Sequence, residues 1–183
     1  MEPFAAALDD GTEVVVRRAT ADDGPAIARM HRRCSLDTVF RRYLTAMPQL
    51  SPALQQRLLD LHLTLVAVHG REVIGLAHVA EAGDGPAELA VMVEDAWQRR
   101  GAGRLLAETA LRCAEADGRT EVVACTLPSS TAVHTLLRRL RHGGLAPRFA
   151  HGDDGLVRVT LHLTPRRDAA PARTAPAPRA LSA

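Results

Sequence analysis

The sequence contains no lysine, few aromatic residues and only three cysteines. All 23 basic residues are arginines, a bias that codon composition explains without functional meaning. Aromatic residues make up 3% of the chain, so the core is expected to consist of aliphatic side chains. The odd number of cysteines, with no CxxC pair, argues against a disulfide framework.

Long apolar runs and a leader-like beginning are also absent. No stretch approaches the roughly 18 apolar residues that a membrane-spanning helix needs. The first ten residues include Glu2, Asp9 and Asp10, whereas a secretory signal begins with basic residues. We therefore expect a soluble, cytoplasmic protein with no membrane partner.

The charge balance argues against a nucleic-acid partner. The chain has 183 residues, of which 46% are hydrophobic and 24% charged, a composition typical of one globular domain. Residues 164–183 hold four arginines and one acid, so residues 1–163 carry −1 of the chain's net charge of +2. A nucleic-acid-binding domain normally carries its basic excess on the fold, with aromatic residues that stack on bases.

Composition divides the chain into three segments. Residues 164–183 are rich in Pro, Ala and Arg and have no apolar period, so a disordered tail is predicted there. Residues 1–12 are predicted to be a flexible extension. The folded domain is therefore expected to run from residue 13 to residue 163.

Hydrophobic periodicity within this domain predicts seven strands and five helices. Apolar runs rich in β-branched residues indicate strands over residues 13–18, 63–69, 73–80, 87–93, 121–127, 146–150 and 156–163. Helical spacing and capping residues indicate helices over about 20–34, 36–46, 51–60, 101–116 and 129–141. The order of these elements predicts an α/β domain with a mixed sheet and helices on its faces.

The most informative segment, residues 87–104, has the sequence AELAVMVEDAWQRRGAGR. A strand and a short loop are followed by Gly101 and Gly103 at the start of a long helix. Glycines allow a ligand to approach the backbone, and the first N–H groups of a helix are unpaired donors at the positive end of its dipole. Positive charge is added by Arg99, Arg100 and Arg104. The pattern predicts a site for a phosphate or diphosphate, although a tight turn with solvated arginines explains it as well.

Two common phosphate-binding motifs are excluded. The Walker A pattern GxxxxGK[ST] does not occur. The Rossmann fingerprint needs a third glycine where this chain has Leu106, and the preceding elements lack a first βαβ unit.

The segment Gln98–Gly103 resembles the Q/R-x-x-G-x-G/A signature of the GNAT superfamily of acyl-CoA-dependent N-acyltransferases. The order of elements over residues 13–163 is similar to that fold too. The resemblance implies a mostly antiparallel sheet that splays between the strands at 87–93 and 121–127, with acetyl-CoA bound in the splay as cosubstrate. The pantetheine is expected to pair with strand backbone and the diphosphate with N–H groups of the loop. The cofactor-binding residues implied are Val91, Met92, Val93, Gln98, Arg99, Arg100, Gly101, Ala102, Gly103, Arg104 and Ser130.

Glu88 lies in an otherwise apolar strand, where an ionised carboxylate is costly unless it is solvated or paired. A surface acid on an edge strand, or a partner for an arginine, would account for it. A partly desolvated glutamate also has a raised pKa and can accept a proton from an amine. In several GNAT enzymes the general base lies on this strand about thirteen residues before the first motif glycine, and Glu88 lies thirteen residues before Gly101. The resemblance therefore implies Glu88 as the catalytic base.

The resemblance leaves the general acid unassigned. Leu137 stands where many family members place a tyrosine that protonates the departing thiolate, and the chain's single tyrosine is Tyr43. A thiol with a pKa near roughly 8.5 is a fair leaving group, so water can take this role. Ser130 is expected to contact the cofactor or to cap the helix that follows.

The acceptor is expected to be a primary amine, on a protein lysine or on a small molecule. Residues 34–43, continuing to 50–52, look similar to the first helices of bacterial GNAT domains that acetylate protein lysines, and an ordinary amphipathic helix pair explains them equally well. The eight histidines show no zinc-ligand spacing, so no metal is expected. The basic side chains at the end of the helix predicted over residues 129–141 are suited to complement its dipole or to meet the 3′-phosphate of CoA. They are Arg138, Arg139, Arg141 and His142.

Together these observations predict an acetyl-CoA-dependent N-acetyltransferase in which the amine attacks the thioester directly. The competing hypothesis is a non-catalytic CoA-binding or protein-interaction module on the same fold, which the missing tyrosine favours. The sequence leaves the acceptor, the acyl length and the oligomeric state open.

Overall fold

The computed structural model of the chain describes residues 1–45, 47, 49–81, 85–140 and 146–164. Over these ranges the chain forms one eight-stranded sheet with the strand order β1-β2-β3-β4-β5-β6-β8-β7. The strands are β1 (Phe4–Ala7), β2 (Glu13–Arg18), β3 (Leu63–His69), β4 (Glu72–Ala80), β5 (Ala87–Val93), β6 (Glu121–Thr126), β7 (Arg148–His151) and β8 (Val157–His162). Apart from Thr164, the tail predicted to be disordered lies outside the described residues, as do Gly143 and Gly144.

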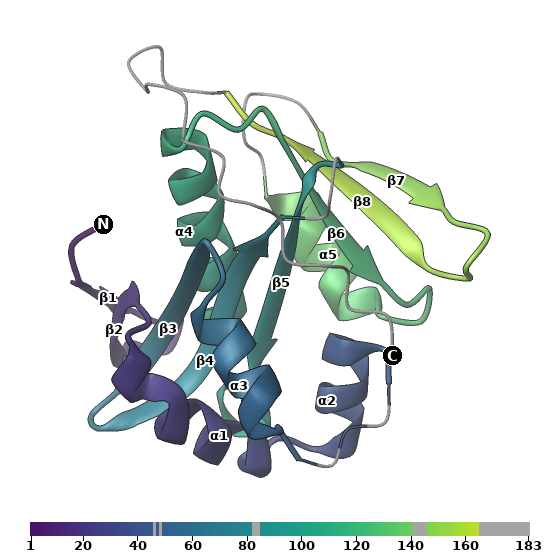
Figure 1. Ribbon diagram of the computed structural model, residues 1–183. Helices are drawn as coiled ribbons and strands as arrows, with labels where there is room; N and C mark the ends of the chain where they lie inside the picture. The colour runs from purple at the N-terminus through teal and green to yellow at the C-terminus, as the bar shows by residue number, and fades with distance from the viewer. Residues whose placement is uncertain (46, 48, 82–84, 141–145, 165–183) are drawn as a thin grey trace.

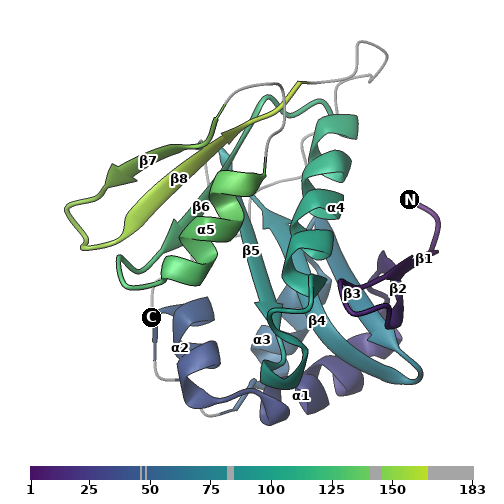
Figure 2. The same ribbon diagram turned by 180° about the vertical axis from the view of Figure 1, so that it is seen from behind.

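Over the same ranges, five α-helices cover the two faces of this sheet. They are α1 (Gly24–Arg33), α2 (Leu36–Tyr43), α3 (Pro52–Leu59), α4 (Ala102–Ala116) and α5 (Thr131–Arg139). Helices α1 and α3 lie in front of the sheet in Figure 1 with α2 beside them, whereas α4 and α5 lie behind it and come to the front in Figure 2. None of the helices in the described ranges is long and apolar enough to span a bilayer.

The alternation of apolar side chains along the strands builds a core on each face. On the α4 face, Leu106 and Leu111 pack with Ile74 and Ala77 of β4 in one buried cluster. On the other face, Ile27 and Met30 of α1, Val39 of α2, Leu76 of β4 and Met92 of β5 form a second cluster. Since neighbouring residues of a strand point to opposite faces, β4 and β5 each contribute side chains to both clusters. The α/β class, the mixed and mostly antiparallel sheet and the helices on both faces are confirmed.

The N-terminal segment differs from the flexible extension predicted over residues 1–12. Phe4–Ala7 form β1, which pairs antiparallel with β2, and the Leu8–Thr12 turn between them is closed by a hydrogen bond from Leu8 N–H to the Thr12 carbonyl (2.9 Å). Alanine is depleted in strands, so the sequence Phe-Ala-Ala-Ala gave no strand signal. This strand is the eighth, beyond the seven predicted.

Strands β5 and β6 are the one parallel pair of the sheet over the described residues. They pair only at Ala87 with Val122 and at Glu88 with Val123. Helix α4 makes the connection between them. Beyond Glu88 the two strands separate, and this splay positions the candidate site.

Candidate active site

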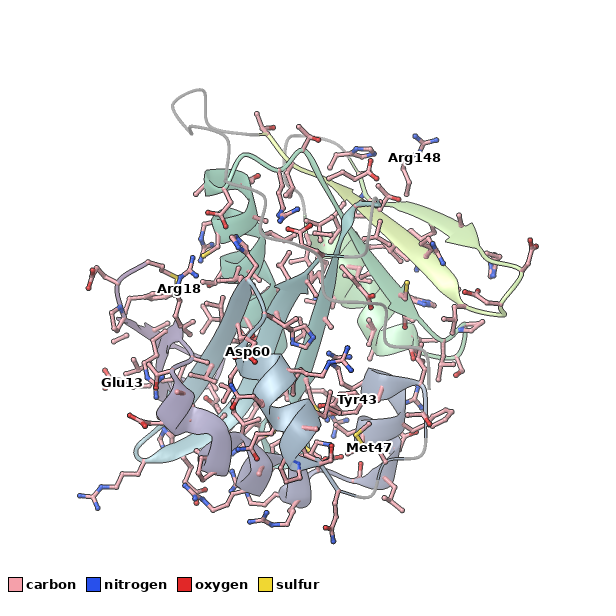
Figure 3. The ribbon with its side chains drawn as sticks, viewed as in Figure 1. Glu13, Arg18, Tyr43, Met47, Asp60 and Arg148 are labelled. Carbon is pink, nitrogen blue, oxygen red and sulfur yellow. The ribbon has the colours of Figure 1, made fainter. Side chains whose placement is uncertain are left out.

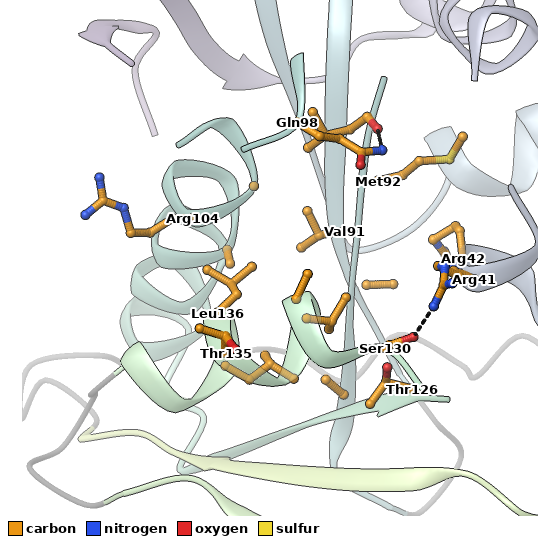
Figure 4. A pocket seen from close by; sticks show the side chains of 18 of the residues that line it. Arg41, Arg42, Val91, Met92, Gln98, Arg104, Thr126, Ser130, Thr135 and Leu136 are labelled. Carbon is orange, nitrogen blue, oxygen red and sulfur yellow. Dashed lines mark hydrogen bonds between the residues drawn. The ribbon is translucent and has the colours of Figure 1, made fainter. Parts of the chain in front are cut away.

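A cavity of about 920 Å³ lies in the splay between β5 and β6 (Figure 4). Its walls come from these two strands and from α2, α4, α5 and the loop before α4. The volume falls within the range of roughly 300–1,000 Å³ that is usual for small-molecule sites. The sequence resemblance placed acetyl-CoA in this splay.

The loop before α4 presents its backbone to this cavity. Gly101 has φ = +92° and Arg99 has φ = +58°, so two residues close together adopt left-handed backbone. Arg99 has a Cβ atom, and such a conformation costs of order 1–3 kcal/mol unless the surroundings hold it. No side chain in the described part of the structure caps the start of α4, so its first N–H groups remain donors for an anion.

The side chains of Gln98 and Asp95 attach this loop to α2. The Gln98 amide donates to the Val93 carbonyl and to the Thr38 hydroxyl, both at 3.0 Å. Asp95 accepts bonds from the N–H (2.8 Å) and hydroxyl (2.7 Å) of Ser35, the cap residue of α2. Burial alone would raise the pKa of Asp95, but the hydrogen bonds from Ser35 and Thr38 outweigh it and hold this pKa below its ordinary value. Gln98 therefore supports the loop through its side chain while it lines the cavity.

The turn between β1 and β2 holds the loop from the opposite side. Asp9 N–H donates to the Arg100 carbonyl (2.9 Å), and the Asp9 carboxylate pairs with Arg104 at 2.6 Å. Arg100 pairs with Asp10, donates to the Thr12 hydroxyl (2.9 Å) and lies 4.5 Å from the centre of the Trp97 ring. In Figure 4 the Arg104 side chain points away from the splay. Two of the three arginines predicted to supply charge are thus already paired with carboxylates.

Most of the residues predicted to bind the cofactor meet at the cavity. Its lining includes Val91, Met92, Val93, Gln98, Arg99, Gly101, Gly103, Arg104 and Ser130, together with Glu88. The two others, Arg100 and Ala102, are not among the lining residues. Ala102 is buried in the core on the α4 face, and Arg100 is turned toward the β1–β2 turn.

Glu88 lies at the point where β5 and β6 part. It is half-buried and lines the cavity. Its strand is central, between β4 and β6, so it is not an edge-strand acid. Within the described chain it makes no ion pair shorter than 4.0 Å. The structure therefore leaves this carboxylate available to a ligand.

Sequence reasoning missed the pair Arg42 and His78, which lie near Glu88. Antiparallel pairing sets Ala80 opposite Glu88 and His78 opposite Ala90, so His78 and Glu88 share one face of the sheet. Arg42 of α2 donates to Nε2 of His78, and its guanidinium lies 4.7 Å from the centre of the Tyr43 ring. Burial, followed by the charge of Arg42, lowers the pKa of His78 well below its ordinary value, so the ring is neutral. A polar residue inside the apolar run of β4 was the one available signal.

Ser130 takes a role that neither prediction described. It stands at the N-cap position of α5, but its side chain makes no capping bond. Instead its hydroxyl accepts a hydrogen bond from Arg41 of α2 at 3.1 Å, which Figure 4 shows as a link across the cavity. This bond joins α2 to the start of α5.

The cavity offers a thiol but no tyrosine from the described residues. Leu137 is 3% exposed and lines the cavity, whereas Tyr43, near the C-terminal end of α2 in Figure 3, is not part of the lining. Burial also raises the pKa of Tyr43. Cys125 of β6 lines the cavity, and burial followed by the Glu88 charge raises its pKa, so it stays a thiol at neutral pH.

Comparison with known proteins agrees with this geometry. The model of the acetyltransferase (GNAT) family matches residues 26–142. The GNAT domain of S. lividans PAT is 25% identical with a TM-score of 0.80, over 88% of this chain and 97% of that one. The putative acetyltransferase yncA of Salmonella typhimurium, solved with acetyl-CoA, is 22% identical with a TM-score of 0.61, over 88% of this chain and 99% of that one. The ribosomal-protein-S18-alanine N-acetyltransferase of Escherichia coli is 17% identical with a TM-score of 0.61, over 85% and 97% of the two chains. The chain belongs to the acetyltransferase (GNAT) family.

Proposed function

We propose that this protein transfers an acetyl group from acetyl-CoA to an amine, with Glu88 as the general base. The observation that carries the proposal is the position of Glu88. Glu88 is the last residue of β5 that pairs with β6 before these two strands separate. It lines the cavity, and the uncapped start of α4 lies at the other end of that cavity. A base and a diphosphate site at two ends of one cavity suit a reaction on a CoA thioester.

Acetyl-CoA would be held mainly by backbone groups. The N–H groups from Arg99 to Arg104 suit the diphosphate, and the free edge of β5 from Val91 to Val93 suits the amide groups of the pantetheine. The left-handed conformations of Arg99 and Gly101 support this assignment, since a strained loop at a cavity persists only where the surroundings hold it. Arg99 lines the cavity and adds a positive charge there.

The proposed chemistry is direct attack. Glu88 removes one proton from the ammonium form of the acceptor, directly or through water, and the free amine attacks the acetyl carbon. The new C–N bond forms, the C–S bond breaks and the electron pair leaves with the CoA sulfur, which takes a proton from solvent. The second amine proton passes to solvent. A covalent route through Cys125 is disfavoured because its thiol is protonated.

A non-catalytic CoA-binding module is the second candidate. It is favoured by Leu137, which gives the cavity an apolar side chain at the position where many relatives carry a tyrosine acid. It predicts stabilisation by CoA and acetyl-CoA without release of thiol for any amine.

The substitution Glu88→Gln separates these functions and tests the base. A general base typically contributes about 10²–10⁴-fold to turnover, so thiol release with an accepted amine should fall by at least 100-fold. The shift of the melting temperature by acetyl-CoA should stay that of the wild type. Glu121→Gln, a substitution of a half-buried glutamate on β6 outside the cavity, is the matched control. Unchanged turnover in Glu88→Gln would reject Glu88 as the general base. Binding of acetyl-CoA by the wild type without turnover of any amine would support the non-catalytic module.

A further inference from the structure

Arg42 places a positive charge near Glu88 in the cavity, and no carboxylate of the described residues forms an ion pair with it. Its Nε atom is fully buried and has no hydrogen-bond partner in the described part of the chain. One terminal nitrogen donates to His78, and the guanidinium lies over the ring of Tyr43. Neither neighbour carries a negative charge, since burial keeps His78 neutral and holds Tyr43 in its phenol form.

The carboxylates nearby do not neutralise Arg42. The charge of Glu88 acts on Arg42, but the two groups form no ion pair within 4.0 Å. Asp37 is engaged by Arg41, which binds it at 2.7 Å and donates to Ser130. A guanidinium taken out of water is costly unless an anion pairs with it, so this end of the cavity needs an anion that the described residues do not supply.

We propose that the acceptor is an amine that also carries a carboxylate, and that Arg42 binds this carboxylate. This inference rests on the proposed acetyl transfer and narrows its substrate to the class of free amino acids. A planar guanidinium can hold a carboxylate with two parallel hydrogen bonds. Arg42 lines the cavity and forms no ion pair with the described residues. Glu88 and Arg42 line the same cavity, so one binds the ammonium end of an amino acid and the other its acidic end.

The same arrangement disfavours the side chain of a protein lysine. Within a polypeptide the lysine carboxyl group is an amide and carries no charge. Such an acceptor would bring a second cation toward Arg41 and Arg42 and would leave Arg42 unpaired. The sequence left open a protein lysine and a small-molecule amine as acceptors. The negative charge of a free carboxylate, which only the second can carry, therefore distinguishes them.

The test compares amino acids with their carboxamides, which have the same shape and lack the negative charge. We expect kcat/KM of the wild-type enzyme to be at least tenfold higher for the acid of each pair than for its carboxamide. Lysine whose α-amino and carboxyl groups are both converted to amides should be a poor acceptor. Arg42→Gln should lower kcat/KM at least tenfold for the acids, mainly through KM, and less than threefold for the amides. Equal use of acids and amides by the wild type, or an equal loss for both in Arg42→Gln, would overturn the proposal.

Arg41→Gln is the matched control, since Arg41 is the neighbouring cavity arginine and is already paired. It should leave the ratio of acid to amide unchanged. If Arg42 acted only through Glu88, Arg42→Gln would shift the pH profile of kcat/KM for acids and amides alike. That result would also overturn the proposal.

A binding measurement separates this proposal from the proposed activity. In calorimetry with the CoA-bound wild type, the Kd of N-acetyl amino acids should be at least tenfold lower than the Kd of their amides. This measurement needs neither turnover nor a folded variant. Binding of the acids without turnover of any amine would support Arg42 and reject the acetyl transfer. Turnover of amines with equal binding of acids and amides would support the acetyl transfer and reject the role of Arg42.

Discussion

Replacing Gly101, the residue before α4, by alanine should cost more stability than the same change at Gly103 in α4 or at Gly118 just after it. Gly101 has φ = +92°, and an added Cβ would lie 2.8 Å from the Asp9 carboxylate. A left-handed conformation costs an L residue roughly 1–2 kcal/mol. The overlap also forces Asp9 away from Arg104, an exposed pair worth roughly 0.2–1 kcal/mol. The sum predicts a loss of about 1–3 kcal/mol in the free energy of unfolding.

Two other glycines serve as controls for the separate parts of this sum. Gly118, just after α4, has φ = +82° and nothing within 4 Å of an added Cβ, so Gly118→Ala reports the backbone cost alone. Gly103 is helical, with its nearest neighbour at 3.7 Å. Gly103→Ala should therefore be neutral or stabilising by up to about 1 kcal/mol, the difference in helix propensity.

Urea denaturation of the three variants, and of Gly101→Ala combined with Asp9→Ala, would measure these differences. We expect Gly101→Ala to be the least stable, Gly118→Ala intermediate and Gly103→Ala equal to or above the wild type. Removal of the Asp9 side chain should bring the cost at Gly101 close to the cost at Gly118. A loss at Gly103 above 1 kcal/mol, or a smaller loss at Gly101 than at Gly118, would refute this account of the loop.

Three further predictions concern the core, the loop and the pH dependence. Leu106 is fully buried against β4, so Leu106→Ala should cost about 2–5 kcal/mol in urea denaturation. Asp95→Ala should cost only about 1 kcal/mol, because the residue is exposed, but should weaken acetyl-CoA binding measured by calorimetry, since Asp95 joins the loop to α2. The pKa of His78 is lowered in the folded state, so only the unfolded state gains a proton as the pH falls below about 6.5. His78 should therefore contribute a loss of stability that approaches roughly 1.4 kcal/mol per pH unit well below that value. His78→Gln should remove about 1.4 kcal/mol of the total loss of stability between pH 7.5 and pH 5.5.

The sequence predicted those parts of the site that depend on the backbone. The two glycines, the strand before them and the spacing to Glu88 are local features, and the structure places them at one cavity. Seven of the eight strands were predicted for the same reason, since period-two patterns are local. The strand β1 was missed because its alanines carry no such pattern.

The rest of the site depends on contacts between segments far apart in the chain. Arg42 meets His78 only because α2 packs over the β4–β5 pair, whose register is not visible in a single sequence. Ser130 lines the cavity, so its predicted contact with the cofactor stays a prediction, whereas the predicted side-chain cap is absent and the hydroxyl is bonded to Arg41 of another helix. Charge pairing across a fold cannot be deduced from composition, particularly in a chain with 23 arginines.

The ion pairs of Asp9 and Asp10 with Arg104 and Arg100 tie the β1–β2 turn to the loop of the candidate site. A truncation that removes the first twelve residues would take away the carboxylates that pair with both guanidinium groups, and with them a support of the loop proposed to receive the diphosphate. A bulky tag fused close to Phe4 would act on the same contacts. The proposed affinity of this cavity for CoA thus depends partly on a turn that lies about ninety residues earlier in the chain than the loop.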